Sequence, residues 1–365
     1  MSAGVGRHFF MAAPTFAGVP MALDRLALLR ELSELPGPPG FEDEVRARLD
    51  KAVRPHADKV RTDRLGNLIA SFEGKGPRVM LAAHMDEVGF IATHLHDGGF
   101  LSFTTLGGWD PRILPGGQVW VLGDEGRALG TIGVKPPHIT SPAEREKVIP
   151  VDELTVDTGL TKRELSAKGI RIGSPMVPAT SFAQLSRHIV AGKAFDDRAG
   201  CTVMAALAET LDGVNADLVF TVQEEVGTRG AGPAAFGLEP DFALVLEGTA
   251  AGDFPGVAEH KRPSAMGKGP VITAADHTTI VPARVVRHLI RTAERAKVNY
   301  QVKKPLVGGT DAGPIHTSRA GVPTAIVSLS VRYLHSWSLM LDLRDMEGEL
   351  RLVRAFLKDV AAGKL

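Results

Sequence analysis

The chain has 365 residues, of which 44% are hydrophobic and 23% are charged, as in a globular protein with a large core. Lysine plus arginine and aspartate plus glutamate each number 42, so charge gives no reason to expect nucleic acid or an anionic membrane as a partner. The single cysteine, Cys201, excludes an intrachain disulfide and a multi-cysteine zinc site, so any metal would need histidine and carboxylate ligands.

Residues 1–20 differ in composition from the rest of the chain. They hold one arginine and an apolar patch that Pro14 and Pro20 interrupt, which makes a poor signal peptide. No run of about 18 apolar residues is present, so we expect no membrane-spanning helix. We therefore expect a disordered extension over 1–20 and a cytoplasmic protein.

The segment after the extension begins with helical periodicity. Leu26, Leu29 and Leu32 share one helical face and predict a helix over 23–35, which the Pro-Gly-Pro-Pro-Gly run at 36–40 ends. The next pattern predicts a second helix over 42–53. Strand-like runs then occur over 67–72, 78–83 and 89–95.

The region 97–179 has a different pattern. Short strand-like pieces over 117–122 and 130–134 alternate with glycine and proline turns, and the only helical pattern is a short one over 162–168. This pattern predicts a compact β-rich inserted domain. The chain on either side, 21–96 and 180–365, is then expected to form one α/β domain.

The α/β alternation returns after the insertion. The patterns predict helices over 198–211, 282–296 and 346–361, and strands over 218–223, 242–246 and 324–329. Strands that alternate with helices favour a mainly parallel sheet with helices on both faces. The predicted fold class is therefore α/β with a small β-rich insertion.

Metal-capable residues stand at the starts or ends of several predicted elements. His84 and Asp86 come after the strand-like run 79–83, so His84 could bind a metal while Asp86 orients it. Asp196 and Asp197 precede a predicted helix. Acidic residues are common at helix starts, so a capping role for each of these two is equally plausible.

Three further sites come after predicted strands. Glu224 and Glu225 end the strand over 218–223, Glu247 comes after 243–246, and His335 comes after 324–329. Open α/β sheets place their sites at the carboxyl ends of parallel strands, so these side chains should meet. Two histidines and several carboxylates can hold two divalent ions about 4 Å apart, and this ligand mixture suits zinc, cobalt or manganese.

Together these segments resemble the tetrahedral and glutamyl aminopeptidases, a family of metallopeptidases with two metal ions whose members are sometimes labelled endoglucanase. The resemblance runs from about residue 23 to near the end of the chain. The segments that carry it are His84-Met-Asp-Glu-Val-Gly89, Ala194-Phe-Asp-Asp-Arg198, Glu224-Glu-Val-Gly227 with Arg229-Gly-Ala231, Gly309-Thr-Asp-Ala312 and Arg332-Tyr-Leu-His-Ser336.

The resemblance implies specific roles for these residues. One metal would be bound by His84, Asp196 and Glu247, and the other by Asp196, Glu225 and His335, with Asp196 bridging. Glu224 would be the general base, and Asp86 would support His84. The sequence departs from the family at Glu247, where aspartate is usual.

The expected activity is a metal-dependent aminopeptidase that acts on peptide substrates. The resemblance also implies a homo-oligomer, of up to twelve subunits, assembled through the inserted domain. Two alternatives remain open at this point: a metal-dependent deacylase or deblocking peptidase, and a peptide-binding shell without catalysis. A glycosidase would leave the two histidines unexplained.

Overall fold

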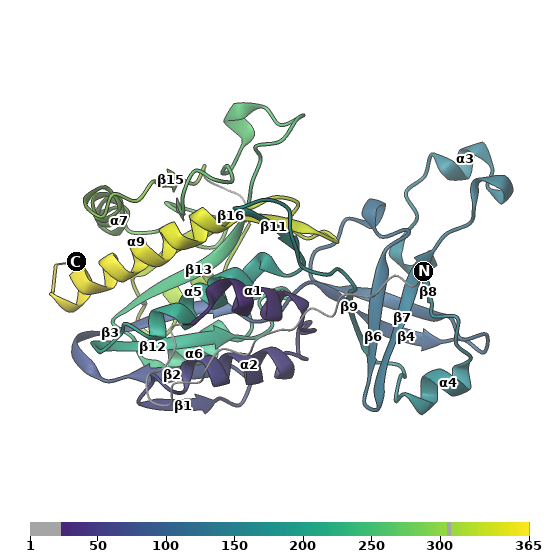
Figure 1. Ribbon diagram of the computed structural model, residues 1–365, viewed down its shortest axis with the longest axis horizontal. Coiled ribbons are helices and arrows are strands. Elements are labelled where there is room, and N and C mark those ends of the chain that lie inside the picture. The colour runs from purple at the N-terminus through teal and green to yellow at the C-terminus, as the bar shows by residue number, and fades with distance from the viewer. Residues whose placement is uncertain (1–22, 305–307, 365) are drawn as a thin grey trace, which may run out of the picture.

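The computed structural model describes residues 23–304 and 308–364, so the extension predicted over 1–20 lies outside the described residues. Figure 1 shows two parts, a larger one with a helix-covered sheet and a smaller one made mainly of strands. Within the described ranges, no helix has both the length and the apolar character needed to cross a bilayer.

A mixed sheet forms the centre of the larger part. Among the described residues it has eight strands in the order β1-β2-β12-β3-β13-β16-β14-β15. The four central strands run parallel, whereas β1, β2 and β14 pair antiparallel with their inner neighbours. The bounds are β1 Lys59–Thr62, β2 Leu68–Phe72, β3 Gly74–His84, β12 Gly213–Thr221, β13 Phe242–Ala250, β14 Val271–Ile272, β15 Gln301–Val302 and β16 Thr324–Val331.

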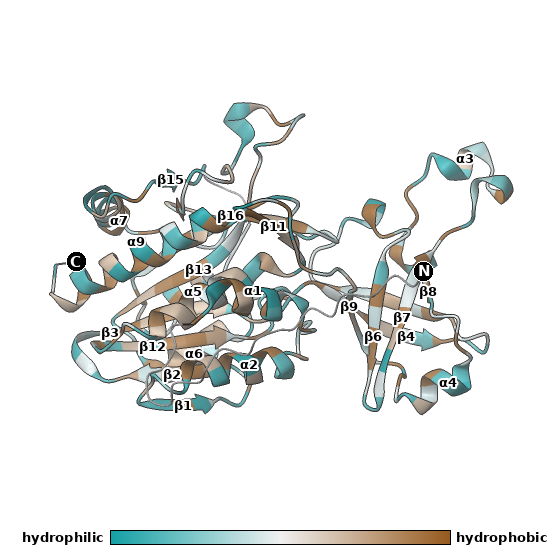
Figure 2. Ribbon diagram, viewed as in Figure 1, coloured by the Kyte–Doolittle hydropathy of each residue, from teal (hydrophilic) through white to brown (hydrophobic). Residues whose placement is uncertain are grey.

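The parallel arrangement predicted from sequence therefore holds for the centre of this sheet and fails toward its edges. The buried stretches of the central strands are apolar, as Figure 2 shows for β12 and β13, because helices cover them on both faces. The β1–β2 pair is antiparallel because only a short turn joins the two strands, and a parallel pair needs a long crossover.

Helices cover both faces of this sheet. On one face α5 (Phe195–Ala208) and α9 (Leu343–Ala361) contact the central strands, and α1 (Arg25–Glu34) and α2 (Asp43–Val53) pack against α5. The connections β3 to β12 and β12 to β13 cross the sheet in opposite directions, so right-handed crossovers place α5 and α6 on opposite faces. The second face therefore carries α6 (Ala231–Leu238) and α8 (Ala312–His316), while α7 (Ala283–Arg295) packs against α9 and β14.

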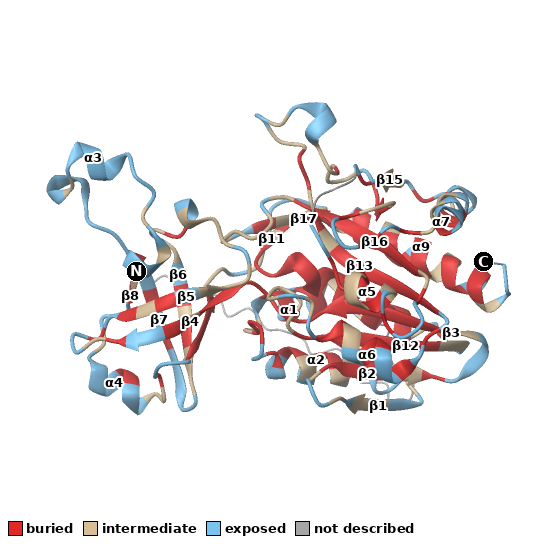
Figure 3. Ribbon diagram, turned by 180° about the vertical axis from the view of Figure 1, so that it is seen from behind, coloured by how far each residue is buried: buried red, intermediate tan, exposed pale blue. Residues whose placement is uncertain are grey.

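The smaller part is a closed barrel with its own apolar core. Its strands succeed one another around the barrel in the order β4-β5-β8-β7-β6-β9. A short helix, α4 (Lys162–Ala167), adjoins the barrel, and α3 (Pro142–Arg145) lies on an exposed arm (Figure 3). The bounds are β4 Gly89–Leu95, β5 Leu101–Leu106, β6 Gln118–Gly123, β7 Gly126–Gly133, β8 Thr155–Asp157 and β9 Pro175–Pro178.

The barrel begins earlier in the chain than the inserted domain predicted over 97–179. Its first strand is β4, which starts at Gly89 and pairs with β5 and β9 of the barrel. Sequence pattern identifies β4 as a strand but does not tell which sheet it joins, since partner choice depends on residues far away in the chain. The end of the barrel at Pro178 lies next to the predicted limit.

A small three-stranded sheet lies between the barrel and the helices. It consists of β10 (Ala183–Gln184), β11 (Ile189–Gly192) and β17 (Leu339–Asp342), all antiparallel. β11 leads directly into the start of α5, where Asp196 and Asp197 lie. This sheet therefore connects the segment returning from the barrel with the start of α5.

Arg198 is the largest fully buried side chain and joins α5 to the N-terminal part of the chain. Its guanidinium donates to the backbone carbonyls of Leu32 and Gly37, at 2.6 and 3.3 Å, and to that of Met85. The Glu87 carboxylate lies 3.6 Å away and also accepts from Lys193 at 2.6 Å. This buried network fixes the segment before α2 against the end of β3.

We expect Arg198→Met to lower the free energy of unfolding by about 3 kcal/mol or more. The substitution removes the donor of the buried Leu32 and Met85 carbonyls and the positive charge beside Glu87, and each such loss costs on the order of 1–3 kcal/mol. Urea unfolding of the metal-stripped protein measures the change. Arg351→Met is the control, because Arg351 also donates to a carbonyl but is exposed. Equal unfolding curves for the two variants would contradict this account.

Candidate active site

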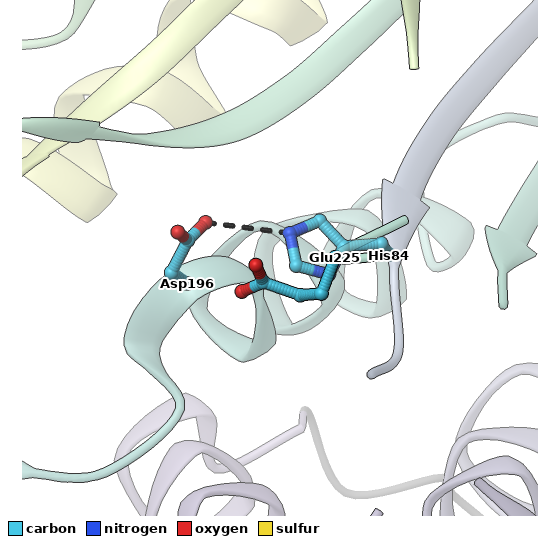
Figure 4. Close-up of side chains that lie close together, drawn as sticks. All are labelled: His84, Asp196 and Glu225. Atoms are coloured by element: carbon cyan, nitrogen blue, oxygen red, sulfur yellow. Dashed lines mark hydrogen bonds and ion pairs between the residues drawn. The ribbon is translucent and has the colours of Figure 1, made fainter. Parts of the chain in front are cut away.

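Four predicted site residues converge at the end of the central sheet. His84 is the last residue of β3 and is 1% exposed. Its Nε2 lies 3.3 Å from Asp196 Oδ1 and 3.3 Å from Glu247 Oε1. Figure 4 shows the side chains of His84, Asp196 and Glu225 pointing toward one another. The imidazole of His84 is therefore surrounded by carboxylates from three other elements.

Asp196 faces a second histidine with its other oxygen. His335 Nε2 lies 3.6 Å from Asp196 Oδ2 and 3.2 Å from Glu225 Oε2. The two oxygens of one carboxylate thus point to two different imidazoles. This is the arrangement expected of a carboxylate that bridges two metal ions.

The ligand atoms present fit divalent cations. One donor atom each from His84, Asp196 and Glu225 lie within 4.8 Å of one another, and the same holds for Asp196, Asp197 and Glu247. Asp197 accepts from the backbone N–H of Gly200 with Oδ1, whereas its buried Oδ2 has no partner within the described parts of the chain. Histidine with carboxylate oxygens suits zinc, cobalt or manganese.

The electrostatics of the cluster also favour bound cations. Burial raises the pKa of Glu247 to about 8 even though the neighbouring His84 lowers it. Burial likewise raises the pKa of Glu224 well above its ordinary value, and nearby Glu247 and Asp311 add to the increase. Burial alone would lower the pKa of His335, but Asp196 and Glu225 outweigh it and raise it to about 11. Too many carboxylates are therefore crowded together for all to ionise without added positive charge.

Comparison with known proteins identifies the family. The family model described as M42 glutamyl aminopeptidase matches residues 66–352. The chain belongs to the M42 glutamyl aminopeptidase family. A lysyl aminopeptidase of Pyrococcus furiosus is 33% identical over 346 residues, which cover 91% of this chain and 96% of that protein.

Solved structures of two peptidases share this fold closely. A TET aminopeptidase from a marine sediment archaeon, Thaumarchaeota archaeon SCGC AB-539-E09, is 37% identical with a TM-score of 0.89, and the match covers 93% of this chain and 99% of that one. The TET1 peptidase of Pyrococcus horikoshii is 30% identical with a TM-score of 0.81, covering 91% and 99%. That peptidase is described as assembling into a tetrahedron or a large octahedral shell.

Two strand ends differ from those predicted for this M42 protein. Glu247 lies inside β13, which continues to Ala250, rather than just beyond the strand. β12 ends at Thr221, so Glu224 and Glu225 lie on a turn and not at the tip of an extended strand. Both carboxylates of that turn can then face the same side, which two adjacent residues on a strand cannot do.

Asp86 lies at the site and contacts His84 through both its backbone and its side chain. His84 Nδ1 is 3.1 Å from the backbone carbonyl of Asp86 and 3.5 Å from its carboxylate. The carboxylate also accepts from the backbone N–H groups of Glu224 and Glu225, each at 3.0 Å. Asp86 therefore joins the end of β3 to the turn that carries both glutamates.

A small pocket lies between the metal-capable cluster and the barrel. Its lining includes Val88, Pro178, Asp196, Glu225 and His335. Pro178 ends the last barrel strand, so the inserted domain forms part of the wall beside the metal-capable cluster. The space measures about 10 Å³, and Asp196 and His335 line it while His84 stays buried.

Proposed function

We propose that this chain is a metal-dependent aminopeptidase that releases N-terminal residues from peptides with two divalent ions per subunit. Membership of the M42 family supports the activity. The two-ion proposal rests on the orientation of Asp196, because one of its carboxylate oxygens faces His84 and the other faces His335. His84, Asp196 and Glu247 would hold one ion, and Asp196, Glu225 and His335 the other.

Glu224 fits the role of general base in this proposal. Glu225 forms an ion pair with His335, whereas Glu224 pairs with neither His335 nor His84. The Glu224 carboxylate is therefore free to accept a proton beside the ions. Bound divalent ions would lower the pKa of a water molecule and polarise the scissile carbonyl. Glu224 would take the proton of the attacking water and then donate it to the leaving amine.

The free α-amino group of the substrate would dock against the buried carboxylates of the cluster. Glu247 and Asp197 are candidates, because they crowd the His84 side of the site. A blocked amine carries no positive charge and would lose this interaction. The proposal therefore predicts cleavage of free peptides and not of their N-acetylated forms.

Hydrolysis of aminoacyl-p-nitroanilides tests the proposed function. The metal-stripped protein should be inactive, and zinc, cobalt or manganese should restore activity toward free aminoacyl substrates. Restored cleavage of acylated substrates alone would instead indicate a deacylase or deblocking peptidase. Two bound ions without any cleavage would indicate a peptide-binding shell and overturn the proposal.

The proposal includes a cytoplasmic homo-oligomer, as large as a dodecamer, with the inserted domain in the subunit interfaces. The assembly described for Pyrococcus horikoshii TET1 supports it. Apolar side chains on the insertion are also exposed in the single chain, with Ile139 70% and Ile172 63% exposed. Size-exclusion chromatography with light scattering checks this, and a monomer at working concentration would remove the assembly from the proposal.

Lys303 suggests which N-terminal residue the site prefers. Its side chain is 6% exposed, and it forms no ion pair with any carboxylate in the described ranges. Burial lowers the pKa of Lys303, while Asp276, Glu247 and Asp196 oppose that decrease, so the amine lies within the electrostatic reach of the proposed ligands. A largely buried cation without an ion pair favours an anionic ligand beside it.

We therefore expect a preference for acidic N-terminal residues that depends on Lys303. Lys303→Met should lower kcat/KM for a glutamyl substrate by about 10-fold and change a leucyl substrate little, since a hydrogen bond to a charged group is worth roughly 1.5–3 kcal/mol. Lys304→Met is the matched control, because the Lys304 amine instead donates to the Glu259 carbonyl at an exposed position. An unchanged glutamyl-to-leucyl ratio in Lys303→Met would contradict this role.

A further inference from the structure

The turn that carries Glu224 and Glu225 leaves the sheet directly after β12. Gln223 has a left-handed backbone with φ of 56°, which favours glycine and is uncommon for a residue with a side chain. Backbone bonds from Gly230 to the Val222 carbonyl and from Arg229 to the Gln223 carbonyl, both 3.1 Å, close the turn. Contacts from outside the turn would therefore add to these backbone bonds in holding the uncommon conformation at Gln223.

Four successive backbone N–H groups of this turn are bound by buried side chains. Val222 N–H donates to Asn67 Oδ1 at 3.0 Å, and Gln223 N–H donates to Glu42 Oε1 at 3.2 Å. The next two N–H groups donate to the two oxygens of Asp86 at 3.0 Å each. Asn67, Glu42 and Asp86 are 0%, 2% and 0% exposed, so water does not compete for these bonds.

Asn67 binds both ends of the turn at once. Its Oδ1 accepts from Val222, while its Nδ2 donates to the Gly230 carbonyl at 2.9 Å. The same Nδ2 donates to Asp63 Oδ2 at 2.6 Å, which fixes the orientation of the amide. One side chain directly before β2 thus closes the turn over residues 222–230.

Glu42 links the turn to the N-terminal segment. Its Oε1 accepts from Gly40 at 2.8 Å as well as from Gln223. Glu42 directly precedes α2, a position at which an acidic residue ordinarily stabilises the helix through its dipole. Its side chain forms no capping bond to that helix and reaches the turn instead.

We propose that Asn67 and Glu42 are positioning residues that hold the turn so that Glu224 faces the reacting water. This inference rests on the proposed function of Glu224. Neither side chain belongs to the metal-capable cluster, so each acts through the backbone of the turn. Displacement of a reacting group by about 1 Å can cost on the order of 100-fold in rate, so a loosened turn should lower kcat far more than substrate binding.

The test compares Asn67→Ala, Glu42→Ala and Glu42→Gln with Thr324→Val in the full-length, metal-loaded protein. Thr324 is the control, because its hydroxyl also makes a buried bond to a carbonyl, at the start of β16 and the opposite end of the sheet from the site. Hydrogen–deuterium exchange of the amides over 222–230 is read beside kcat, KM and metal content. The exchange measurement does not depend on activity.

We expect kcat of Asn67→Ala and Glu42→Ala to fall about 10- to 100-fold, with KM within about 3-fold and both ions retained. Exchange over 222–230 should become faster in both alanine variants only. Glu42→Gln should recover most of the activity, because an amide oxygen can still accept from Gln223.

Four results would overturn the inference, the last of them independently of activity. The first is kcat within about 2-fold of the parent in both alanine variants. The second is exchange that rises throughout the α/β domain together with metal loss, since that shows a general effect on stability. The third is equal loss in Glu42→Gln and Glu42→Ala. If Asn67→Ala does not fold, the two Glu42 variants decide. If the parent protein has no peptidase activity, the proposed function fails. If exchange over 222–230 is unchanged in the variants, Asn67 and Glu42 do not hold the turn, whatever the activity.

Discussion

Glu224→Gln should lower kcat for free aminoacyl substrates by about 1,000-fold or more and leave the fold and both metal ions in place. The amide has nearly the same shape as the carboxylate but cannot take a proton from water. General base catalysis contributes roughly 100- to 10,000-fold in enzymes, which sets the size of the expected loss. Because Glu224 makes no ion pair with His84 or His335, the substitution should not weaken metal binding.

Glu239→Gln is the matched control for this experiment. Glu239 lies at the end of α6 with its side chain 64% exposed and pairs with Arg319, so its amide variant should keep full activity. Steady-state rates, metal analysis and thermal melting should be measured for all three proteins. If Glu224→Gln retained more than about a tenth of the parent kcat, another group would have to accept the proton. If it lost metal, Glu224 would be a ligand.

The central architecture could be predicted because its signals are local. Apolar runs such as those of β3 and β16 read as buried strands, and the amphipathic pattern of α9 reads as a helix. Sequence pattern places the strand β4 in the wrong domain, because a strand's sequence does not reveal its neighbour. Likewise it does not reveal the continuation of β13 through Glu247, since a charged residue in a strand usually marks its end.

The metal-capable residues could be identified for a similar reason. His84 comes directly after an apolar strand, and the pair Glu224-Glu225 is costly after such a strand unless it binds something. Asn67 and Glu42 carry no comparable signal. Asn67 comes after Gly66 and reads as a turn residue, and Glu42 reads as the start of a helix. Their contacts with the turn over 222–230 come from pairings across more than 150 residues of chain, which only the fold reveals.

Asp196→Asn should abolish activity by removing both metal ions, whereas Glu247→Gln should weaken chiefly one. The Asp196 oxygens face His84 at 3.3 Å and His335 at 3.6 Å, so this residue belongs to both halves of the cluster. Asparagine keeps one oxygen and loses the negative charge, and its NH₂ group cannot bind a cation. Of the two histidines, Glu247 contacts His84 alone. Substitution of Glu247 therefore leaves Asp196, Glu225 and His335 to bind the second ion.

Metal analysis after dialysis and calorimetric titration distinguish these two patterns. We expect two ions in the parent, one in Glu247→Gln and none in Asp196→Asn at a concentration where the parent is saturated. Even loss of a group that only orients a metal ligand lowers affinity by about 10- to 100-fold, so loss of a shared ligand should lower it further. Asp345→Asn is the control, because Asp345 is a buried carboxylate that binds the N–H groups of Gly267 and Gly269, away from both histidines. Two ions bound to Asp196→Asn with parental affinity would show that Asp196 does not bridge them, and the paired orientation of its oxygens would then reflect only the charge of the two imidazoles.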